Sequence, residues 1–381
     1  MKKQKLFIGG GCLAELQGLL DSLNIKNVFL VAGKRSYSLS GAEAALASAL
    51  ESRRVTRFSG FTANPDWEEI MSGVDLYRES SPGIMIAVGG GSSMDTAKMI
   101  NLLADYHGDP KTVFAAETDP GLAVPLIAIP TTAGSGSEAT RFAVMYLDGV
   151  KQSAAFWSLV PDYAFVDYKL GLSMSSSQKA CSGIDALAQA VESMWAVDAT
   201  AESRRYAVDA VKLLIPSLPD FVAGKSDAAA EDVFQGAYLA GRAINISKTT
   251  ACHALSYYLT SIYNIPHGHA VAIFVPEILR VNSELNQNNC QPGVDTDAVL
   301  SAVRTILDAF GAATAAAFKE VWYSLMQKIE LETMISALVD DAEDSVAEAL
   351  AASVNLDRLA NNPRRLAPDE IQELVKNCWK N

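Results

Sequence analysis

The spacing of apolar residues changes near residue 173, and this change constrains the fold more than any other feature of the sequence. Before it, short apolar runs alternate with amphipathic segments, an order that predicts a parallel sheet covered by helices. After it, strand signals nearly vanish and apolar residues recur at helical spacing. We therefore expect an α/β domain over residues 1–176 and an all-helical domain over residues 177–381.

The expected elements follow from the same pattern. In the first domain, strands are predicted at residues 5–8, 28–32, 55–59, 84–88, 126–129 and 163–167, and helices at residues 12–23, 42–53, 67–79 and 93–105. Two further runs, residues 142–147 and 151–157, flank Asp148 and Gly149, a pair typical of a hairpin turn. In the second domain, helices are predicted at residues 178–195, 201–214, 229–244 and 249–263, with more after residue 295.

The amino-acid composition argues against several classes of protein. The 381 residues include 31 basic and 44 acidic side chains, which argues against non-specific nucleic-acid binding and against an anionic membrane surface. No apolar run is long enough to span a bilayer, and the start lacks the apolar stretch of a signal peptide. The five cysteines are widely spaced without a CxxC pair, which fits a reducing compartment. We expect a cytoplasmic enzyme.

Two glycine-containing loops each follow a predicted strand. Gly90, Gly91 and Ser92 open a helix, so backbone N–H groups and the helix N-terminus can approach a phosphate. The second loop, residues 131–138, offers glycines and small hydroxyl side chains that suit ribose and phosphate oxygens. Open α/β sheets bind ligands at the carboxyl ends of their strands, so the two loops predict a nucleotide cofactor. The alternative is a pair of tight turns that bind nothing.

Histidine is rare in this chain, and two of its four histidines suggest a metal site. His253 lies on a predicted helix and His267 follows in a Pro-His-Gly turn, a pair that suits a divalent ion. Asp185 lies in an otherwise apolar helix and could be the anionic ligand, and Gln189 shares its face as a weak fourth ligand. The alternative is a set of hydrogen-bonded core residues.

A basic and hydroxyl-rich segment directly precedes His253. Arg242 and Lys248 supply positive charge, and Asn245 and Thr249 supply hydrogen-bond donors. Such a set suits a phosphonate or phosphate dianion in the substrate. The alternative is an exposed turn with solvated charges.

Four motifs in order resemble the iron-dependent (group III) alcohol dehydrogenases over essentially the whole chain. These are GGGSSMDTAK at 89–98, PTTAGSGSE at 130–138, GIDALAQAVE at 183–192, and the pairing of His253 with Pro266-His267-Gly268. The resemblance implies a Rossmann-like nucleotide domain and a helical metal domain, as in the dehydroquinate synthase-like fold. It also implies cofactor and metal meeting between the domains, and a homodimer or larger homo-oligomer.

The resemblance also implies roles for individual residues. Asp185, His253 and His267 match metal ligands, while Gln189 and Tyr257 stand where many members have histidine. Asn64 and Lys151 match positions that contact the cofactor. Further matches lie beside the pyrophosphate, at Gly90, Gly91, Ser92 and Asp95. A third group lies near the phosphates and nicotinamide, at Thr131, Thr132 and Ser135.

The segment GRAINISKTTACH at 241–253 resembles the phosphonoacetaldehyde reductase (hydroxyethylphosphonate dehydrogenase) branch of the family. Cofactor choice is suggested by Gly33, which stands where NAD-specific members often have an acidic residue. Lys34 and Arg35 follow it and make room for a 2′-phosphate, so we expect NADP(H), with NAD(H) as the alternative.

The expected reaction is reversible reduction of a small anionic aldehyde. Fe(II), or Zn(II), would polarise the carbonyl oxygen while the nicotinamide supplies hydride. Arg242 and Lys248 would anchor the anionic end of the substrate, and His269 or Tyr257 would deliver the proton.

Three alternatives remain open at the level of sequence. The first is an iron-type alcohol dehydrogenase for neutral short-chain substrates. The second is a dehydroquinate synthase-like lyase, which would need a larger set of basic residues than this chain offers. The third is a non-catalytic nucleotide-binding protein, for which the replacement at Gln189 is the one supporting feature.

Overall fold

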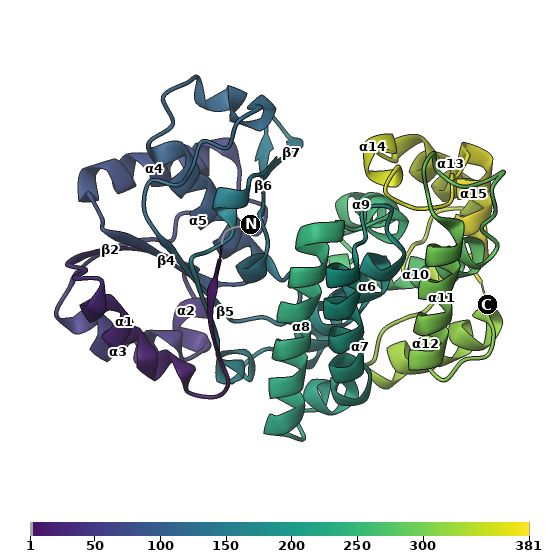
Figure 1. Ribbon diagram of the computed structural model, residues 1–381, viewed down its shortest axis with the longest axis horizontal. Coiled ribbons are helices and arrows are strands. Elements are labelled where there is room, and N and C mark those ends of the chain that lie inside the picture. Colours follow the sequence, from purple (N-terminus) through teal and green to yellow (C-terminus); the bar gives the residue numbers. More distant parts are fainter. Residues whose placement is uncertain (1–2, 381) are drawn as a thin grey trace. The chain divides into compact units, whose positions relative to one another are not determined.

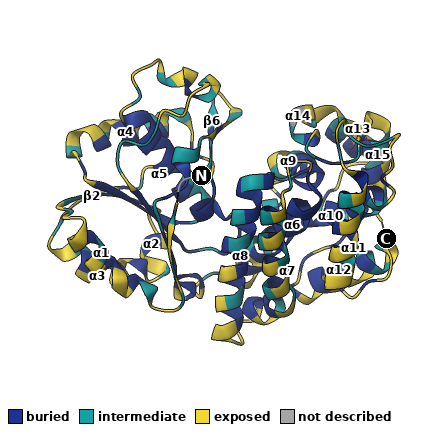
Figure 2. Ribbon diagram, in the orientation of Figure 1, coloured by how far each residue is buried: buried dark blue, intermediate teal, exposed yellow. Residues whose placement is uncertain are grey.

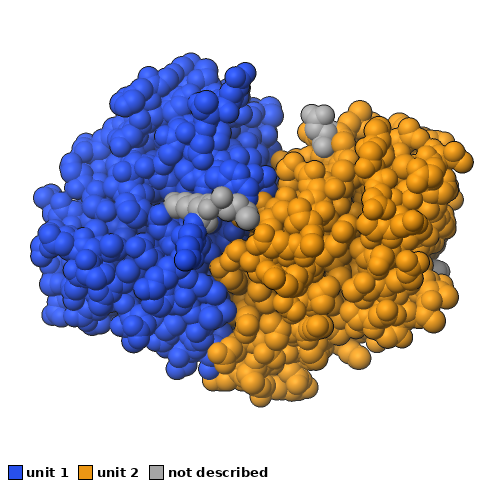
Figure 3. Space-filling model, in the orientation of Figure 1, with its two compact units in different colours: residues 1–174 blue, residues 175–381 orange. Residues whose placement is uncertain are grey.

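The computed structural model describes residues 3–380, apart from the side chain of Asp357. The chain divides into two compact units at Met174 and Ser175, and Figure 3 colours them separately. The sequence placed the domain boundary at residue 176, two residues beyond this division.

The first unit is built on a parallel six-stranded sheet (Figure 1), as the alternating pattern predicted. Every neighbouring pair in the order β1-β8-β5-β4-β2-β3 is parallel. The strands are β1 (Lys5–Ile8), β2 (Asn27–Ala32), β3 (Arg54–Phe58), β4 (Ile84–Gly89), β5 (Leu126–Pro130) and β8 (Tyr163–Val166).

The two central strands explain why the sheet needs helices on both faces. β4 and β5 are buried along their whole length, and their continuous apolar sequences are typical of parallel strands covered on both sides. Successive side chains of β4 alternate between two apolar clusters, Met85 facing one and Ile86 the other. Helices α4 (Trp67–Ser80) and α5 (Gly91–Ala104) complete the first cluster, and α1 (Glu15–Ser22) and α3 (Ala42–Glu51) complete the second (Figure 2).

An antiparallel hairpin follows β5. Strands β6 (Phe142–Leu147) and β7 (Val150–Ala155) are joined by Asp148 and Gly149, which both have positive φ, 51° and 75°. Positive φ at both central residues is the geometry of a two-residue type I′ turn. The predicted hairpin is therefore confirmed, with its second strand beginning one residue earlier than expected.

Among the residues that the structure describes, the regular elements of the second unit are all helices, apart from one isolated bridge between Cys290 and Arg364. Its first helix begins at a capping box, in which Ser175 and Gln178 satisfy each other's backbone N–H groups. Its α-helices are α6 (Ser176–Trp195), α7 (Ala201–Val222), α8 (Asp227–Ser247), α9 (Ala251–Tyr263), α10 (His267–Ser283), α11 (Thr296–Ala309), α12 (Ala315–Lys328), α13 (Glu343–Ser353), α14 (Leu356–Leu359) and α15 (Pro368–Asn377).

Helix α7 is longer than the sequence indicated. The prediction stopped at residue 214, and beyond it Pro216 and Pro219 lack the N–H that a helix interior uses. The helix continues to Val222 because Leu218 and Phe221 in its last turns are buried, and α7 packs along α8. No helix among the described residues combines the length and the apolar character that crossing a bilayer requires.

Candidate metal centre

Helix α6 presents three buried polar side chains on one face. Asp185, Gln189 and Glu192 are spaced by four and three residues, so they project from the same side of the helix. Asp185 is 7%, Gln189 4% and Glu192 0% exposed, in a helix that is otherwise mostly apolar at its buried positions. Buried polar groups need partners, and two neighbouring helices supply them.

Helices α9 and α10 bring two histidines to this face. One ligand atom from each of Asp185, His253 and His267 lies within 4.8 Å of the others, and we call these three residues the metal cluster. The close approach of α10 depends on Gly268. A Cβ atom at that position would lie 2.0 Å from the Cys181 carbonyl oxygen, so any larger residue would force α10 away from α6.

The cluster and Gln189 fit a divalent cation. Asp185 Oδ1, Gln189 Oε1 and His253 Nε2 are all buried, and none makes a hydrogen bond. The Gln189 amide donates to Asp185 Oδ2 at 2.9 Å, which fixes its oxygen as the free atom. Buried polar atoms without partners are rare in folded proteins, and a bound ion accounts for three of them at once. Imidazole with carboxylate and amide oxygens suits Fe(II) or Zn(II).

Glu192 was not among the candidate ligands, yet it holds the cluster in place. Its Oε2 is hydrogen-bonded to Nδ1 of His253, which leaves Nε2 directed toward Asp185 at 3.5 Å. Its Oε1 accepts from the Thr250 backbone N–H, the Thr250 hydroxyl and the Cys252 backbone N–H, at 3.1, 2.7 and 2.9 Å. One carboxylate therefore both caps α9 and orients a ligand histidine. The signal in the sequence was a third polar residue on the Asp185 face of an apolar helix.

The charges of the cluster favour a cation. Burial alone would lower the pKa of His253, but the adjacent Glu192 and Asp185 carboxylates outweigh it and raise that pKa to about 9. Burial opposes ionisation of Asp185 and Glu192, yet contacts with the histidines and nearby donors hold the pKa of both carboxyls below the ordinary value. Two buried carboxylates thus surround His253 and attract positive charge.

The two candidate proton donors lie in different surroundings. The ring of Tyr257 stacks on His267 with centroids 5.8 Å apart, and its hydroxyl accepts a hydrogen bond from Arg358. His269 is buried, and its Nε2 lies 2.7 Å from the carbonyl oxygen of Glu332. Burial lowers the pKa of His269. The structure therefore brings Tyr257 to the metal cluster and engages His269 with the backbone instead.

The structure does not gather the charges of the basic segment at one point. Arg242 donates to the Tyr206 hydroxyl at 2.8 Å and lies over its ring. Lys248 is exposed and pairs with Asp198 at 2.8 Å. Of the other two candidates, Asn245 is buried in α8, and the carbonyl of Thr249 accepts from Asn361 at 2.8 Å. Arg242 and Lys248 were expected to share one anion, and they contact different partners.

The two glycine loops of the first unit contact each other. They follow β4 and β5, which are neighbours in the sheet. A Cβ atom at Gly90 would lie 3.1 Å from the Thr132 hydroxyl, and one at Gly91 would lie 3.2 Å from the Ser135 hydroxyl. Thr131 joins the loops by donating its N–H to the carbonyl of Gly89 at 2.9 Å. The N-terminus of α5 thus lies beside a hydroxyl-rich loop, an arrangement suited to a phosphate.

Three further candidate cofactor residues lie near this helix end. The Ser92 hydroxyl donates to the carbonyl of Ala63, which brings the exposed Asn64 close to the start of α5. Lys151, in β7, is half-buried and its charge acts on Asp95.

Asp95 itself contacts protein groups. Its carboxylate accepts from the Ser137 hydroxyl at 2.9 Å and from the Val144 N–H at 3.2 Å. Burial raises its pKa. Asp95 therefore fixes the second loop and the hairpin relative to α5.

Basic side chains surround Gly33 at the end of β2. Arg57, on the neighbouring strand β3, donates to the Gly33 carbonyl at 2.9 Å, and Lys34 and Arg35 are exposed beside it. A Cβ atom at Gly33 would lie 2.4 Å from the Ser36 hydroxyl, so an acidic side chain would not fit there without a shift. The sequence indicated two of these basic residues, and the parallel pairing of β2 with β3 adds Arg57.

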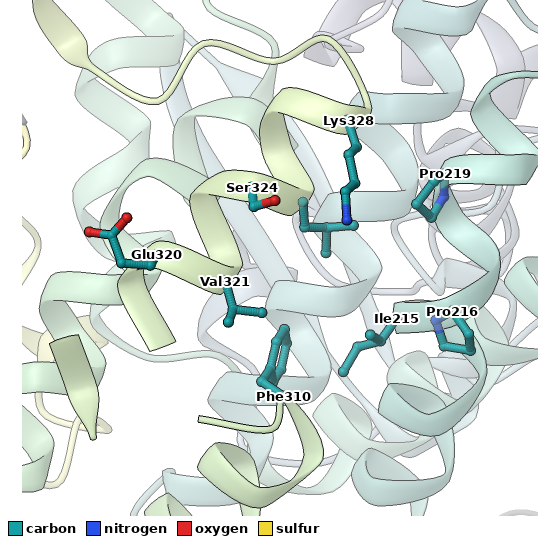
Figure 4. A pocket seen from close by; sticks show the side chains of 9 residues that line it. Ile215, Pro216, Pro219, Phe310, Glu320, Val321, Ser324 and Lys328 are labelled. Carbon is teal, nitrogen blue, oxygen red and sulfur yellow. The ribbon is translucent and has the colours of Figure 1, made fainter. Parts of the chain in front are cut away.

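A cavity of about 520 Å³ lies elsewhere in the helical unit, between α7 and α12 (Figure 4). None of the metal-cluster residues lines it. Its wall is mainly apolar, with one acidic and one basic side chain, and it offers no group of metal ligands. It is lined by Ile215, Pro216, Pro219, Phe310, Glu320, Val321, Ser324, Leu325 and Lys328.

Comparison with known proteins agrees with this geometry. Residues 3–168 match the iron-containing alcohol dehydrogenase family, and residues 179–379 match the C-terminal part of the Fe-containing alcohol dehydrogenase family. Phosphonoacetaldehyde reductase from Streptomyces viridochromogenes is 32% identical over 77% of this chain and 75% of that protein. Long-chain-alcohol dehydrogenase 1 from Geobacillus thermodenitrificans is 32% identical over 71% of this chain and 70% of that protein.

A solved structure extends the likeness to the full length. Sulfoacetaldehyde reductase from Bifidobacterium kashiwanohense, in complex with NAD+, superposes with a TM-score of 0.87 at 25% identity, covering 99% of this chain and 97% of that one. The two family matches together span both units, in the order that the four motifs predicted. The resemblance, the fold class and the enzyme class are therefore confirmed. This chain belongs to the iron-containing alcohol dehydrogenase family.

Proposed function

We propose that this enzyme reduces phosphonoacetaldehyde to 2-hydroxyethylphosphonate with a nicotinamide cofactor and a divalent metal. The observation that carries the proposal is the convergence of three unsatisfied buried atoms, from Asp185, Gln189 and His253, beside His267. These four residues would hold the metal, Fe(II) in the first instance and Zn(II) as the alternative. When bound, the metal would polarise the aldehyde oxygen, and the cofactor would supply hydride.

The protein's own residues then have defined tasks. Glu192 keeps Nδ1 of His253 engaged, so that Nε2 faces the cluster. Tyr257 would give the proton to the developing alkoxide. Its oxygen accepts from Arg358, and its ring lies against His267. His269 is the less suitable donor because its Nε2 is engaged with the Glu332 carbonyl.

The substrate class is supported by two relatives with related names. One is a phosphonoacetaldehyde reductase and the other a sulfoacetaldehyde reductase. Both names describe a two-carbon aldehyde that carries an anionic group next to the reacting carbon. A single site chemistry would serve both, namely a carbonyl directed at the metal and a cation close to it.

A neutral short-chain aldehyde is the second candidate substrate. It is favoured by the pairing of Lys248 with Asp198 and of Arg242 with Tyr206, since each of these cations is already engaged by another side chain. The lyase alternative gains no support among the described residues, because the metal cluster is not surrounded by the set of basic side chains that a phosphorylated sugar acid needs.

We propose NADP(H) as the preferred cofactor, with NAD(H) as the alternative. Lys34, Arg35 and Arg57 surround Gly33 at the end of β2, where an acidic residue would otherwise bind the ribose 2′-hydroxyl. The phosphates would bind at the N-terminus of α5 and on the hydroxyls of Thr132 and Ser135.

We further propose a cytoplasmic homo-oligomer. All five cysteines are free, as is usual for a reducing compartment. The family resemblance supports a dimer or larger assembly, and light scattering after gel filtration measures it directly.

The decisive experiment compares two aldehydes. The protein is loaded anaerobically with Fe(II), and NADPH oxidation is followed with phosphonoacetaldehyde and with propanal. A kcat/KM ratio of 100 or more in favour of the phosphonate, about 2.7 kcal/mol of transition-state binding, supports the proposal. A ratio near or below one supports the neutral-aldehyde alternative. Absence of any cofactor oxidation with either aldehyde would contradict both.

A further inference from the structure

Arg358 and the cluster residue His267 both contact the ring of Tyr257. Arg358 lies on α14, which packs against α9 (Figure 1). Its guanidinium lies 4.9 Å from the ring centroid of Tyr257, and one of its nitrogens donates to the Tyr257 hydroxyl. The same ring stacks on His267, with ring centroids 5.8 Å apart. All three side chains are half-buried.

The charge of Arg358 is not neutralised by any described carboxylate. Its side chain contacts Tyr257, whereas Lys248 pairs with Asp198 and Arg364 pairs with Glu370. Acidic residues outnumber basic ones by 44 to 31 in this chain, so carboxylate partners are abundant. An arginine without a carboxylate partner among the described residues is suited to an anion from outside the protein.

Hydrogen bonds hold the backbone of the segment that carries Arg358. The Asn355 side chain caps α14 by accepting from the Arg358 N–H at 3.0 Å. Two residues after α14, Asn361 donates to the carbonyls of Ser247 and Thr249, both at 2.8 Å. The segment that carries Arg358 is thus fastened to the turn that leads into α9. A site ordered before binding loses less entropy when the ligand arrives.

We propose that Arg358, supported by the Tyr257 ring, binds the anionic group of the aldehyde substrate while the carbonyl faces the metal cluster. This inference rests on the proposed function and names its specificity-determining residue. In a two-carbon anionic aldehyde, the phosphonate is attached to the carbon next to the carbonyl, so its binding group must lie close to the cluster. Arg358 and the cluster residue His267 contact the same tyrosine ring, whereas Lys248 is already paired with Asp198.

The chemistry of the side chain fits the ligand. A guanidinium presents five N–H donors in a planar fork, and Tyr257 uses one of them. The remaining donors can form a bidentate pair with two oxygens of a phosphonate or a sulfonate. Lysine would supply the charge without the fork, so Arg358→Lys separates the two contributions.

The test compares Arg358→Gln, Arg358→Lys and the control Arg365→Gln in the Fe(II)-loaded enzyme. Arg365 is exposed and lies seven residues further along the chain, where it donates to the carbonyl of Asn288. We expect Arg358→Gln to lower the ratio of kcat/KM for phosphonoacetaldehyde to that for propanal at least 100-fold, mainly through KM. Arg358→Lys should recover part of the ratio, and Arg365→Gln should leave it unchanged.

Binding of the product gives a second readout that does not depend on turnover. Calorimetric titration with 2-hydroxyethylphosphonate should show at least a tenfold weaker Kd for Arg358→Gln at unchanged iron content and Tm. If the parent enzyme prefers the phosphonate and Arg358→Gln keeps that preference, the inference is overturned while the proposed function stands. If the parent enzyme shows no preference, the phosphonate assignment and this inference both fail.

Discussion

Glu192 of α6 and His253 of α9 form a buried carboxylate–imidazole pair in which the carboxylate also caps the helix that carries the histidine. The pair makes the position of the ligand nitrogen depend on the start of α9, because the same carboxylate accepts from the N–H groups of Thr250 and Cys252. Local helix geometry and ligand orientation are thereby set by one side chain that touches no metal.

Replacement of Glu192 by glutamine should weaken metal binding while preserving the fold. The amide can still cap α9 through its oxygen, but its NH₂ group then faces Nδ1 of His253 and moves the imidazole proton to Nε2, the ligand atom. Loss of such outer partners lowers metal affinity by about 10- to 100-fold. Chelator competition with Zn(II) measures the change.

The control for this prediction is the metal-free protein. Glu192→Gln and the parent should unfold at similar temperatures when both are stripped of metal. Equal Zn(II) affinities in the two proteins would show that His253 is oriented without help from Glu192.

The sequence indicated the parallel sheet, the hairpin and the order of the helices because each depends on local periodicity. β4 is an unbroken apolar run, and the pair Asp148-Gly149 favours a turn through its own backbone preferences. The length of α7 escaped prediction because burial of Leu218 and Phe221 outweighs the two prolines, and burial is a property of the packed unit.

The site was predictable where the ligand chemistry itself is rare, as at Asp185, His253 and His267. Its supporting residues were not, because Glu192 and Arg358 are common residue types whose meaning comes from what they face. Arg358 lies 101 residues from Tyr257 in the chain, so no local pattern connects them. In the basic segment before His253, the sequence neighbours Arg242 and Lys248 contact different partners, which a local pattern cannot show.

Gly268→Ala should loosen the junction between α6 and α10. The added methyl would lie 2.0 Å from the Cys181 carbonyl oxygen and 2.7 Å from Cβ of Asp185, and neither can move without shifting α6. We expect a loss of about 1–3 kcal/mol in the free energy of unfolding, together with weaker metal binding. Urea denaturation and chelator competition measure the two effects.

The matched control is Gly18→Ala in α1, where a Cβ atom would meet nothing within 4 Å. That change should stabilise the protein by about 0.5–1 kcal/mol, because alanine is the better helix former. A Gly268→Ala protein with parent-like stability and Zn(II) affinity would mean that α10 approaches α6 less closely than described.

Arg57→Gln should reduce the preference for NADPH. Arg57 and the exposed Lys34 and Arg35 surround the end of β2, where a ribose 2′-phosphate would bind. A hydrogen bond to a charged group contributes about 1.5–3 kcal/mol, so the ratio of kcat/KM for NADPH to that for NADH should fall about tenfold or more. Arg54→Gln, at an exposed position on the same strand, is the control. A parent enzyme that prefers NADH would overturn the cofactor assignment.

Glu138→Gln should change how stability depends on pH. Burial raises the pKa of Glu138, a 4% exposed residue in the second cofactor loop, to about 7 from a reference of 4.5. The folded protein therefore binds this proton more tightly than the unfolded chain. Stability contributed by the neutral carboxyl is fully present below pH 4.5 and is lost as pH rises to about 7, on the order of 3 kcal/mol.

Urea unfolding of the metal-free, cofactor-free protein at pH 5, 6 and 7.5 measures this window. Burial lowers the pKa of the neighbouring Lys98 to about 8. Titration of Lys98 therefore changes the free energy of unfolding only at higher pH. The parent should lose stability relative to Glu138→Gln as pH rises through the window, since the amide keeps the shape of the side chain without titrating. The stability of Glu51→Gln, a change at an exposed site on α3, should depend on pH in the same way as that of the parent. If the stability of Glu138→Gln depends on pH in the same way as that of the parent, the Glu138 carboxylate is solvated at neutral pH. The second glycine loop would then be open to water in solution.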